Sequence, residues 1–455
     1  MIGVGVAIPS LITVAQLGLD PWAADALGRM QAPPDDFVRR LDAGARIYRA
    51  DGVLDRLDAL WVTGSYSQTA ARLNLVPWTG TVTNALTNSE FAGAAPGVLP
   101  TGLSLAGFAA GSGNNYEIQG VDSVNGQRFI RLRLYGTSVG VGAVTFSVRS
   151  DTNVDIGQRW TSSASVELVS GSWVAGLSAV TLRLNSDGGG SNFIPGARAQ
   201  YTNTRVATLA STGGNLVLRY STPTATTTPV TYDVVLRIGM PQLVRMDVPG
   251  NYIPTSGAAA SQVQTLYRWD LSEINNPTWA AWAPGAPGAP GGYGGNGTTS
   301  YLDTNADPSF DFSKATLSSA SYGAWTGLNL TSGFSLGDTN NRVSINPRTS
   351  GDQIVVRVNS PSGLTSAAGT VPTAVGLTVA NRPSENLREG WKNGVLVVSD
   401  TQAPSSLPVD LALLRAGATY SANRVLAAFA GAALLSPAQH LAAYRGLATM
   451  LGVAV

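Results

Sequence analysis

Residues 237–243, RIGMPQL, followed by residues 251–257, NYIPTSG, decide the fold of this chain. An apolar strand ends here at a turn that carries a proline, and the chain then returns as a short extended Tyr-Ile-Pro segment. Proline cannot donate a hydrogen bond to a β-ladder, so it is found at strand ends, sheet edges and turns. The pattern is typical of the last strand of an antiparallel β-sandwich.

Alternation of apolar and polar residues extends this interpretation over residues 77–262. Residues 129–135 read FIRLRLY, in which apolar side chains alternate with arginine, as in a half-exposed antiparallel strand. Five further segments alternate in the same way: residues 144–148, 164–168, 180–184, 216–220 and 232–238. Turn-forming residues separate them at the spacing of an all-β sandwich. We therefore expect a mainly β chain.

The same residues carry a resemblance to a known group of proteins. The closing stretch resembles the PQLE…TSYIPTSGA ending of sandwich modules in phage tail-fibre and head-spike proteins, although Val244 replaces their usual acidic residue. Residues 126–138 and 157–163 are similar to the head-spike fibre module and its jelly-roll relatives, many of which bind carbohydrate. The resemblance implies a jelly-roll, carbohydrate-binding-like domain over residues 77–262.

Residues 263–455 predict a second antiparallel sandwich. Residues 297–304, GTTSYLDT, look like a signature of concanavalin A-like lectin sandwiches in phage structural proteins, and residues 380–382 and 390–394 match its later part. Asn393-Gly394 favours a type I′ hairpin turn. Ser436 and Pro437 predict the start of a terminal helix. The proline- and glycine-rich residues 284–291 predict a stiff loop.

The first 76 residues predict a base for these modules. Residues 1–34 are apolar but lack an early basic residue and contain Pro9, so a docking or oligomer-forming anchor is favoured over core packing or export. Residues 35–76 read as helices that pack on the C-terminal module, with Asp36 as N-cap and a break at Gly52.

The apolar side chains of the expected helices recur at helical spacing: Phe37, Leu41, Ala45, Tyr48, Leu54, Leu57, Leu60 and Trp61. Residues 57–62 and 70–74 resemble a helical segment that runs directly into the lectin strands in relatives of the second module. This resemblance implies that the sandwich of residues 77–262 is inserted into a larger unit.

Composition excludes several classes of function. Charged residues make up 13% of the chain and its net charge is +1, so no basic surface for nucleic acid is expected. The chain has no cysteine, which removes disulfides and thiolate chemistry. His440 is the single histidine, expected at a partly exposed helical position without a catalytic triad. No Walker loop or dinucleotide fingerprint is present, and we expect no cofactor and no metal.

Acidic residues are the remaining candidates for chemistry. Glycan hydrolysis needs two carboxylates that face each other across the sugar bond. The candidates are Asp303, Asp307 and Asp311, or Asp151 and Asp155 with Glu167. The first three lie in a turn-rich stretch where Asp serves turn geometry. The segment from Asp151 to Asp155 imitates a calcium loop but lacks its closing acid. We expect no catalytic residues.

Sugar binding without catalysis needs an aromatic face with amide and carboxylate groups around it. These requirements select six residues in the first sandwich: Tyr116, Asn114, Asn115, Trp160, Trp173 and Tyr201. Trp160 fits a core position equally well. Trp325 and Trp391 are the analogous candidates in the second sandwich, and hairpin packing is the simpler interpretation of Trp391.

The resemblances imply a surface spike or fibre protein of a phage or gene transfer agent particle. Such a protein attaches to a capsid or spike-base protein, binds cell-surface polysaccharide such as a capsule, and forms a homo-oligomer, with a trimer favoured. It is assembled in the cytoplasm without a signal peptide or membrane insertion. Two alternatives stay open, a capsular polysaccharide depolymerase and a purely structural fibre or baseplate component.

Overall fold

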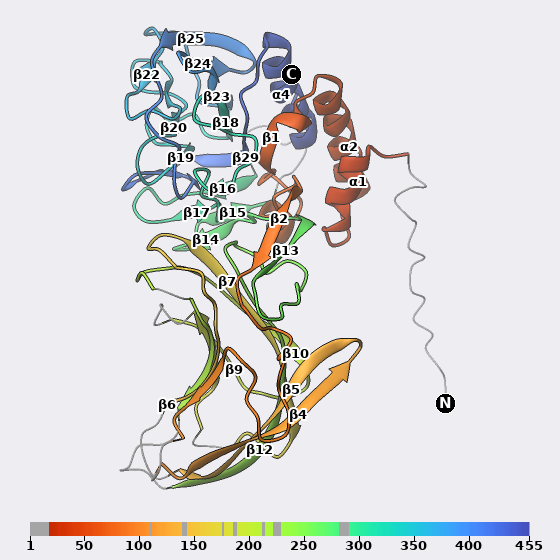
Figure 1. The fold of residues 1–455 in the computed structure, drawn as a ribbon. Helices are drawn as coiled ribbons and strands as arrows, with labels where there is room; N and C mark the ends of the chain where they lie inside the picture. Colours follow the sequence, from red (N-terminus) through yellow and green to blue (C-terminus); the bar gives the residue numbers. More distant parts are fainter. Residues whose placement is uncertain are drawn as a thin grey trace, which may run out of the picture. The chain divides into compact units, whose positions relative to one another are not determined.

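The computed structural model describes residues 18–108, 112–138, 143–174, 177–184, 189–211, 214–221, 229–281 and 291–454. The protein is mainly β, with 43% strand and 12% helix, and its sheets are antiparallel (Figure 1). No helix within the described ranges is long and apolar enough to cross a membrane. The chain divides into two compact units: the inserted unit, Thr79–Leu266, and the split unit, Met1–Trp78 with Tyr267–Val455.

Two five-stranded sheets form the inserted unit, together with a two-stranded ribbon. The long sheet has the order β10-β7-β12-β5-β4: β4 Asn114–Val124, β5 Gln127–Ser138, β7 Arg159–Ser170, β10 Ala199–Val206 and β12 Val230–Val244. The short sheet has the order β3-β6-β11-β8-β9: β3 Leu103–Ala106, β6 Ala143–Val148, β8 Val180–Leu184, β9 Ser191–Phe193 and β11 Leu216–Ser221. The ribbon pairs β2 Trp78–Asn84 with β13 Ala260–Leu266.

The side-chain alternation in these strands produces the core of the inserted unit. Ile130, Leu132 and Leu134 of β5 are buried between the two sheets, while Arg131 and Arg133 lie on the outer face of the long sheet. Successive side chains of a strand point to opposite faces, so a period-two sequence places one apolar face inward. All six segments that alternate in sequence lie within strands, which confirms that prediction.

Two larger sheets and one small hairpin form the β-structure of the split unit. The eight-stranded sheet contains β1 Leu57–Trp61, β15 Thr278–Ala280, β16 Gly292–Gly294, β18 Ala320–Thr326, β23 Gly376–Ser384, β24 Leu387–Lys392, β25 Val395–Thr401 and β29 Arg424–Gly431. The seven-stranded sheet contains β14 Ser272–Ile274, β17 Tyr301–Asp303, β19 Leu336–Gly337, β20 Ser344–Asn346, β21 Val355–Arg357, β22 Leu364–Thr365 and β26 Ala412–Leu413. The hairpin is β27 Arg415–Ala416 with β28 Thr419–Tyr420.

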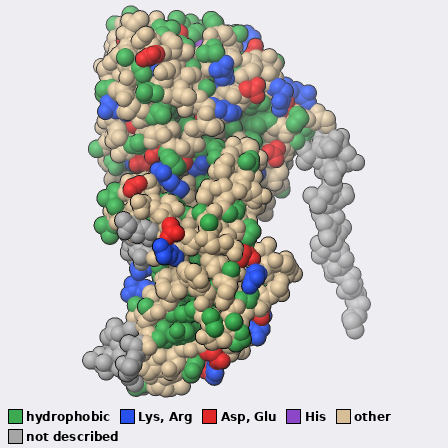
Figure 2. Space-filling view, in the orientation of Figure 1, with side chains coloured by type: hydrophobic (Ala, Val, Ile, Leu, Met, Phe, Trp, Pro, Cys, Tyr) green, Lys and Arg blue, Asp and Glu red, His purple; other side chains and the backbone are tan. Residues whose placement is uncertain are grey.

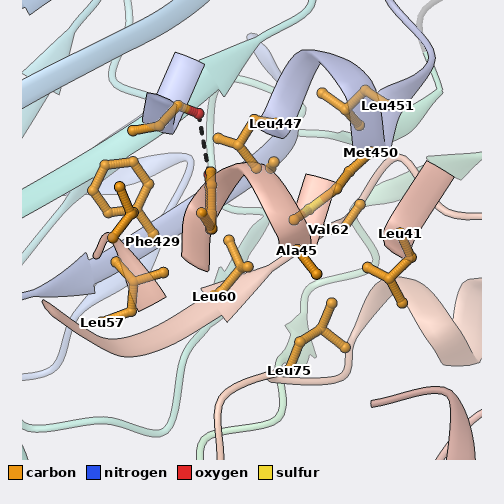
Figure 3. Close-up of a cluster of buried hydrophobic side chains, with 14 of the residues drawn as sticks. Leu41, Ala45, Leu57, Leu60, Val62, Leu75, Phe429, Leu447, Met450 and Leu451 are labelled. Atoms are coloured by element: carbon orange, nitrogen blue, oxygen red, sulfur yellow. Dashed lines mark hydrogen bonds between the residues drawn. The ribbon is translucent and has the colours of Figure 1, made fainter. Parts of the chain in front are cut away.

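Buried side chains from both larger sheets form one shared core, so the split unit is sandwich-like. Helices pack on the other face of the eight-stranded sheet, and Figure 3 shows part of that second core around Leu60 and Leu447. The helices are α1 Pro21–Gly28, α2 Asp35–Ala50, the 3₁₀ turn η2 Leu54–Arg56, α3 Gln68–Ala71 and α4 Pro437–Leu451. Ser436 caps α4 by accepting a hydrogen bond from the Gln439 backbone N–H, as predicted.

The prediction of helix was wrong over residues 57–61, although Leu54–Arg56 forms a 3₁₀ turn. Leu57–Trp61 is strand β1, which pairs with β29 and is buried along its whole length. A short apolar run that is buried on both faces has no period that separates strand from helix. The predicted N-cap was also wrong, because Pro34 occupies that position and Asp35 and Asp36 lie in the first turn of α2.

The structure describes only part of the predicted anchoring segment, residues 1–34. Residues 1–17 lie outside the described residues. The described part contains α1, whose Trp22, Ala23 and Ala26 are buried in the core that α1 shares with α2 and α4. Core packing, the alternative that the sequence disfavoured, therefore holds for residues 21–28. Residues 284–290 of the expected stiff loop also lie outside the described residues.

Candidate functional site

Aromatic side chains gather at one end of the inserted unit. The pairing of β4, β5 and β12 places the starts of β4 and β12 next to the end of β5, where Asn114 and Tyr232 both align with Gly136. The end of β11 and the segment that follows β7 reach the same place. We call this place the aromatic end and define it by five residues: Phe108, Tyr116, Trp173, Tyr220 and Tyr232.

Ring contacts and hydrogen bonds join these residues into one cluster. The Trp173 ring lies edge-on to Tyr220 with 5.2 Å between centroids, and Tyr220 lies 6.5 Å from Tyr232. The Tyr232 hydroxyl donates to Asn114 Oδ1 at 2.9 Å. Asn114 Nδ2 in turn donates to the Gly107 carbonyl at 3.2 Å, next to Phe108.

The outer layer of the aromatic end is accessible to solvent. Tyr116 is 39% exposed and lies edge-on to Phe108 at 4.8 Å. Trp173 is half-buried, and its indole N–H donates to the Ser178 carbonyl at 3.1 Å. Tyr220 and Tyr232 are buried beneath them, and burial raises the pKa of both hydroxyls. The outer rings therefore rest on two buried, neutral tyrosines, of which Tyr232 is hydrogen-bonded to Asn114.

Two glycines allow the chain to close this end. Gly113 and Gly136 both have positive φ, of 70° and 134°, and their backbones approach each other directly. A Cβ atom on Gly136 would overlap the Gly113 carbonyl oxygen, and one on Gly113 would overlap the Thr137 carbonyl oxygen. Only glycine fits where two backbones meet in this conformation. These glycines explain why Asn114 and Tyr116 begin β4 at this point.

The carboxylates nearest the aromatic end are held by arginine on the outer face of the long sheet. Arg133 Nη2 lies 2.7 Å from Asp233 Oδ2, and its Nη1 lies 3.5 Å from Glu117 Oε2. The hydrogen bond from Arg133 lowers the pKa of Asp233. Farther along the same face, Arg237 pairs with both Asp122 and Glu167. On the molecular face seen in Figure 2, basic and acidic side chains are likewise interspersed.

The structure brings together some of the six predicted binding residues. Tyr116, Trp173 and Asn114 meet at the aromatic end, and Asn115 is exposed beside them on the outer side of β4. Asn114 is only 4% exposed and serves as the hydrogen-bond partner of Tyr232. The predicted residues at this end therefore divide into exposed groups and one internal support.

The other two predicted residues lie elsewhere in the inserted unit. Trp160 sits at the opposite end of β7, is 3% exposed, and donates its indole N–H to Gln158 Oε1 at 3.1 Å. Its position is the core alternative that the sequence left open. Tyr201 in β10 stacks on Phe193 with 3.6 Å between centroids. The rings of Trp160 and Tyr201 are therefore both engaged in packing within the inserted unit.

Sequence reasoning missed Phe108, Tyr220 and Tyr232 as members of the cluster. Tyr220 and Tyr232 belong to segments that were recognised only as strands. Their signal is positional, because each lies at the end of an alternating segment next to glycine-rich or threonine-rich residues. Strand ends that carry an aromatic residue are where a sandwich can present a ring to solvent.

The candidates in the split unit are buried. Trp325 stacks on Tyr444 of α4 at 5.4 Å, and Trp391 stacks on His440 of α4 at 3.8 Å. The expectation of a partly exposed His440 was wrong, because the side chain lies on the buried face of α4 and is 1% exposed. Burial lowers the pKa of His440 to about 3. Helix α4 thus covers Trp325 and Trp391, the two rings that the sequence analysis selected as binding candidates in this unit.

The acidic candidates each have a structural partner. Asp311 pairs with Arg268 at 2.7 Å, and Asp307 accepts hydrogen bonds from the Ser309 backbone and hydroxyl. Asp151 pairs with Arg149 at 2.7 Å, and Asp155 accepts from Gln158. Within the described ranges, no group of three or more His, Cys, Asp or Glu residues is placed to hold a metal ion.

The cavity between the two sheets of the inserted unit is too small to hold a ligand. This cavity has a volume of about 20 Å³ and is lined by apolar groups, among them Leu132, Val144 and Leu218. A space of this size holds about one water molecule. This cavity is therefore too small for a sugar.

Comparisons with known proteins do not assign the chain to a family. No model of a protein family matches the chain. A search of curated proteins also finds no match.

Proposed function

We propose that this chain is a non-enzymatic surface spike or fibre protein of a phage or gene transfer agent particle. In this proposal the aromatic end of the inserted unit binds polysaccharide on the target cell. The sequence resemblances described above and the mainly antiparallel, sandwich-like architecture support it. A jelly-roll identity for the inserted unit and a concanavalin A-like identity for the split unit are parts of the same proposal.

The observation that carries the proposal is the half-exposed ring layer formed by Phe108, Tyr116 and Trp173. An aromatic face attracts the C–H side of a pyranose, and nearby amides satisfy its hydroxyls. Asn115 is the adjacent exposed amide, on the opposite face of β4 from the Tyr116 ring. The buried Tyr232–Asn114 hydrogen bond holds the layer in place without occupying its outer surface.

The environment of the nearby carboxylates favours binding over hydrolysis. A glycosidase needs one carboxylic acid that stays protonated until it donates to the leaving oxygen. Glu117 and Asp233 share Arg133, and this guanidinium lowers the pKa of Asp233. A carboxylate in that state is a poor general acid. This arrangement supports the adhesin over the depolymerase.

The expected partners follow from the same proposal. Weak single sites are sufficient on a particle, because identical copies bind one surface together and gain affinity by avidity. We therefore propose a homo-oligomer, with a trimer favoured, that attaches to a capsid or spike-base protein. A structural fibre component without a ligand is the rival that a binding experiment must exclude.

The test compares binding of the purified full chain to capsulated and capsule-free cells of the presumed host, with release of reducing ends followed in parallel. We expect capsule-dependent binding without sugar release, and loss of binding in the Tyr116→Ala and Trp173→Ala variants. Ile156→Ala is the matched control, because Ile156 is 68% exposed and precedes the opposite end of β7. Sugar release would establish the depolymerase, and binding unaffected by both aromatic variants would refute the assigned site.

A further inference from the structure

A second cluster of polar and aromatic side chains lies on the split unit, outside the site described above. Its members are Tyr301 and Asp303 in β17, Asp410 before β26, Arg415 in β27 and Tyr420 in β28. All five are half-buried. Tyr301 and Asp303 flank the buried Leu302 in β17, and the half-buried Tyr301 also packs against the edge of the core. We call these five residues the Tyr301 cluster.

Arg415 and the two tyrosines are in direct contact. The Arg415 guanidinium carbon lies 4.3 Å from the centroid of the Tyr301 ring. The rings of Tyr301 and Tyr420 are 5.9 Å apart and tilted by 43°. Pairing of β27 with β28 fixes this arrangement, because Arg415 is aligned with Tyr420 across the hairpin. Two rings and one cation therefore occupy one spot on a rigid hairpin.

The two carboxylates are close enough to influence Tyr301. Burial raises the pKa of the Tyr301 hydroxyl; Arg415 opposes this effect, while Asp303 and Asp410 add to it. The cluster therefore combines two acceptors with one donor at the edge of an aromatic surface. Its formal charge is negative by one unit, since Arg415 balances one of the two carboxylates.

Most of the hydrogen-bonding capacity of the cluster is unused. Asp303 Oδ1 accepts from the Asn305 backbone N–H at 2.7 Å. Arg415 Nη2 lies 3.4 Å from both the Thr339 hydroxyl and the Asp410 carbonyl oxygen, to which it donates. Among the described residues, no hydrogen bond within the protein engages the Asp410 carboxylate or the hydroxyls of Tyr301 and Tyr420. Half-buried polar groups that converge without satisfying one another are typical of a surface that binds a polar ligand.

The backbone beside the cluster is strained. Asp410 and Leu414 have φ values of 48° and 66°, although neither is glycine. Leu414 is fully buried, and a bulky residue in this region is a genuine outlier. Backbone strain of this kind clusters at functional sites. These two residues flank β26 and set the course of the chain between Asp410 and Arg415.

We propose that the Tyr301 cluster is a second glycan-binding site, selective for neutral polysaccharide. A tyrosine ring packs against the C–H face of a pyranose, the carboxylates accept hydrogen bonds from its hydroxyls, and Arg415 donates one. The two carboxylates disfavour an acidic polysaccharide by like-charge repulsion. The site stands independently of the aromatic end, which lies in the other unit.

The test measures binding of soluble polysaccharides to the full chain carrying Trp173→Ala, so that the aromatic end does not contribute. The probes are dextran, mannan and galactan as neutral polymers and polygalacturonate as an acidic one, followed by saturation-transfer NMR. We expect at least one neutral polymer to bind. Tyr420→Ala, or Asp410→Asn, which tolerates the positive φ, should then weaken binding about tenfold.

Thr419→Ala is the control, because Thr419 is exposed and adjacent to Tyr420. It should leave binding unchanged, and circular dichroism should show that every variant is folded. The proposal is overturned if no neutral polymer binds, if Tyr420→Ala and Asp410→Asn bind as well as the Trp173→Ala parent, or if polygalacturonate binds best. Loss of cell attachment by Trp173→Ala alone bears on the aromatic end and leaves this result separate.

Discussion

Both units contain tryptophans that pack against a second aromatic ring, but these tryptophans are buried in the split unit and half-exposed in the inserted unit. In the split unit, the pairs Trp391–His440 and Trp325–Tyr444 are closed by helix α4, and both tryptophans are buried. In the inserted unit, Trp173 has a similar neighbour in Tyr220 but remains half-exposed. What differs is the cover: a helix lies over the first pairs, whereas the described residues place no helix in the inserted unit.

The comparison teaches that a ring's function depends on what covers it. A covered ring contributes to stability through buried apolar area. An uncovered ring on a rigid base contributes little to stability and is available to a ligand. Substitutions should therefore separate the two classes: stability should fall for the first, and binding should fall for the second.

The largest effect is expected for Trp391→Ala. Removing a buried tryptophan leaves a cavity beneath α4 and should lower the free energy of unfolding of the split unit by about 3–5 kcal/mol. Trp173→Ala should cost about 1 kcal/mol or less, because its ring is half-exposed. Urea denaturation followed by far-UV circular dichroism compares the two. Equal losses would break the distinction between covered and uncovered rings.

His440 should make the covered pair sensitive to pH. Burial lowers its pKa to about 3 in the folded state from 6.5, so the unfolded chain binds the proton first. Stability is then lost as pH falls through 6.5 toward 3, by about 2 kcal/mol between pH 7 and pH 5. Glu389, whose Oε2 lies 4.0 Å from His440 Nε2, reduces this loss.

The variant His440→Phe keeps a ring against Trp391 and removes the titrating group. Neither His440 nitrogen makes a hydrogen bond of normal geometry, so the replacement breaks none. As pH falls from 7 to 5, the free energy of unfolding of the wild-type protein should therefore decrease relative to that of the variant. A difference that is constant from pH 7 to pH 5 would contradict the assigned titration.

A smaller effect tests how closely α4 is held over the sheet. The backbones of α2 and α4 approach where Gly446 faces Tyr48, and a Cβ atom on Gly446 would overlap the Tyr48 ring. Gly446→Ala should destabilise the split unit by about 1–3 kcal/mol through overpacking. Gly28→Ala in α1 is the matched control, because its Cβ would meet no atom within 4 Å. Thermal melting should show a lower midpoint for Gly446→Ala alone.

The smallest effect is expected on the outer face of the inserted unit. Asp122 accepts hydrogen bonds from Arg237 and Arg131, which lower its pKa against the opposing effect of burial. Asp122→Asn should cost about 1 kcal/mol or less, and the difference should shrink in high salt. Denaturation at low and high ionic strength measures it. A loss that salt does not change would mean that packing, rather than charge, stabilises this face.

The sequence predicted most of the strands but not what covers them. Alternation identified β5 and β6 correctly because one face of each strand is more deeply buried than the other. It failed at Leu57–Trp61, where burial on both faces leaves no alternation to read. The predicted binding residues were partly exposed and partly buried for the same reason. Tyr116 and Trp173 were chosen from local turn context, whereas the burial of Trp160 and Trp391 depends on distant segments that no local pattern reports.

Hydroxyl-radical footprinting of the full chain, with and without capsular polysaccharide from the presumed host, separates rings that bind a ligand from rings that only pack. Our account predicts that Tyr116 and Trp173 react in the free protein and are protected when the polysaccharide is bound, while Trp391 is unreactive in both states. Binding of the polysaccharide with no change at Tyr116 and Trp173 would contradict it.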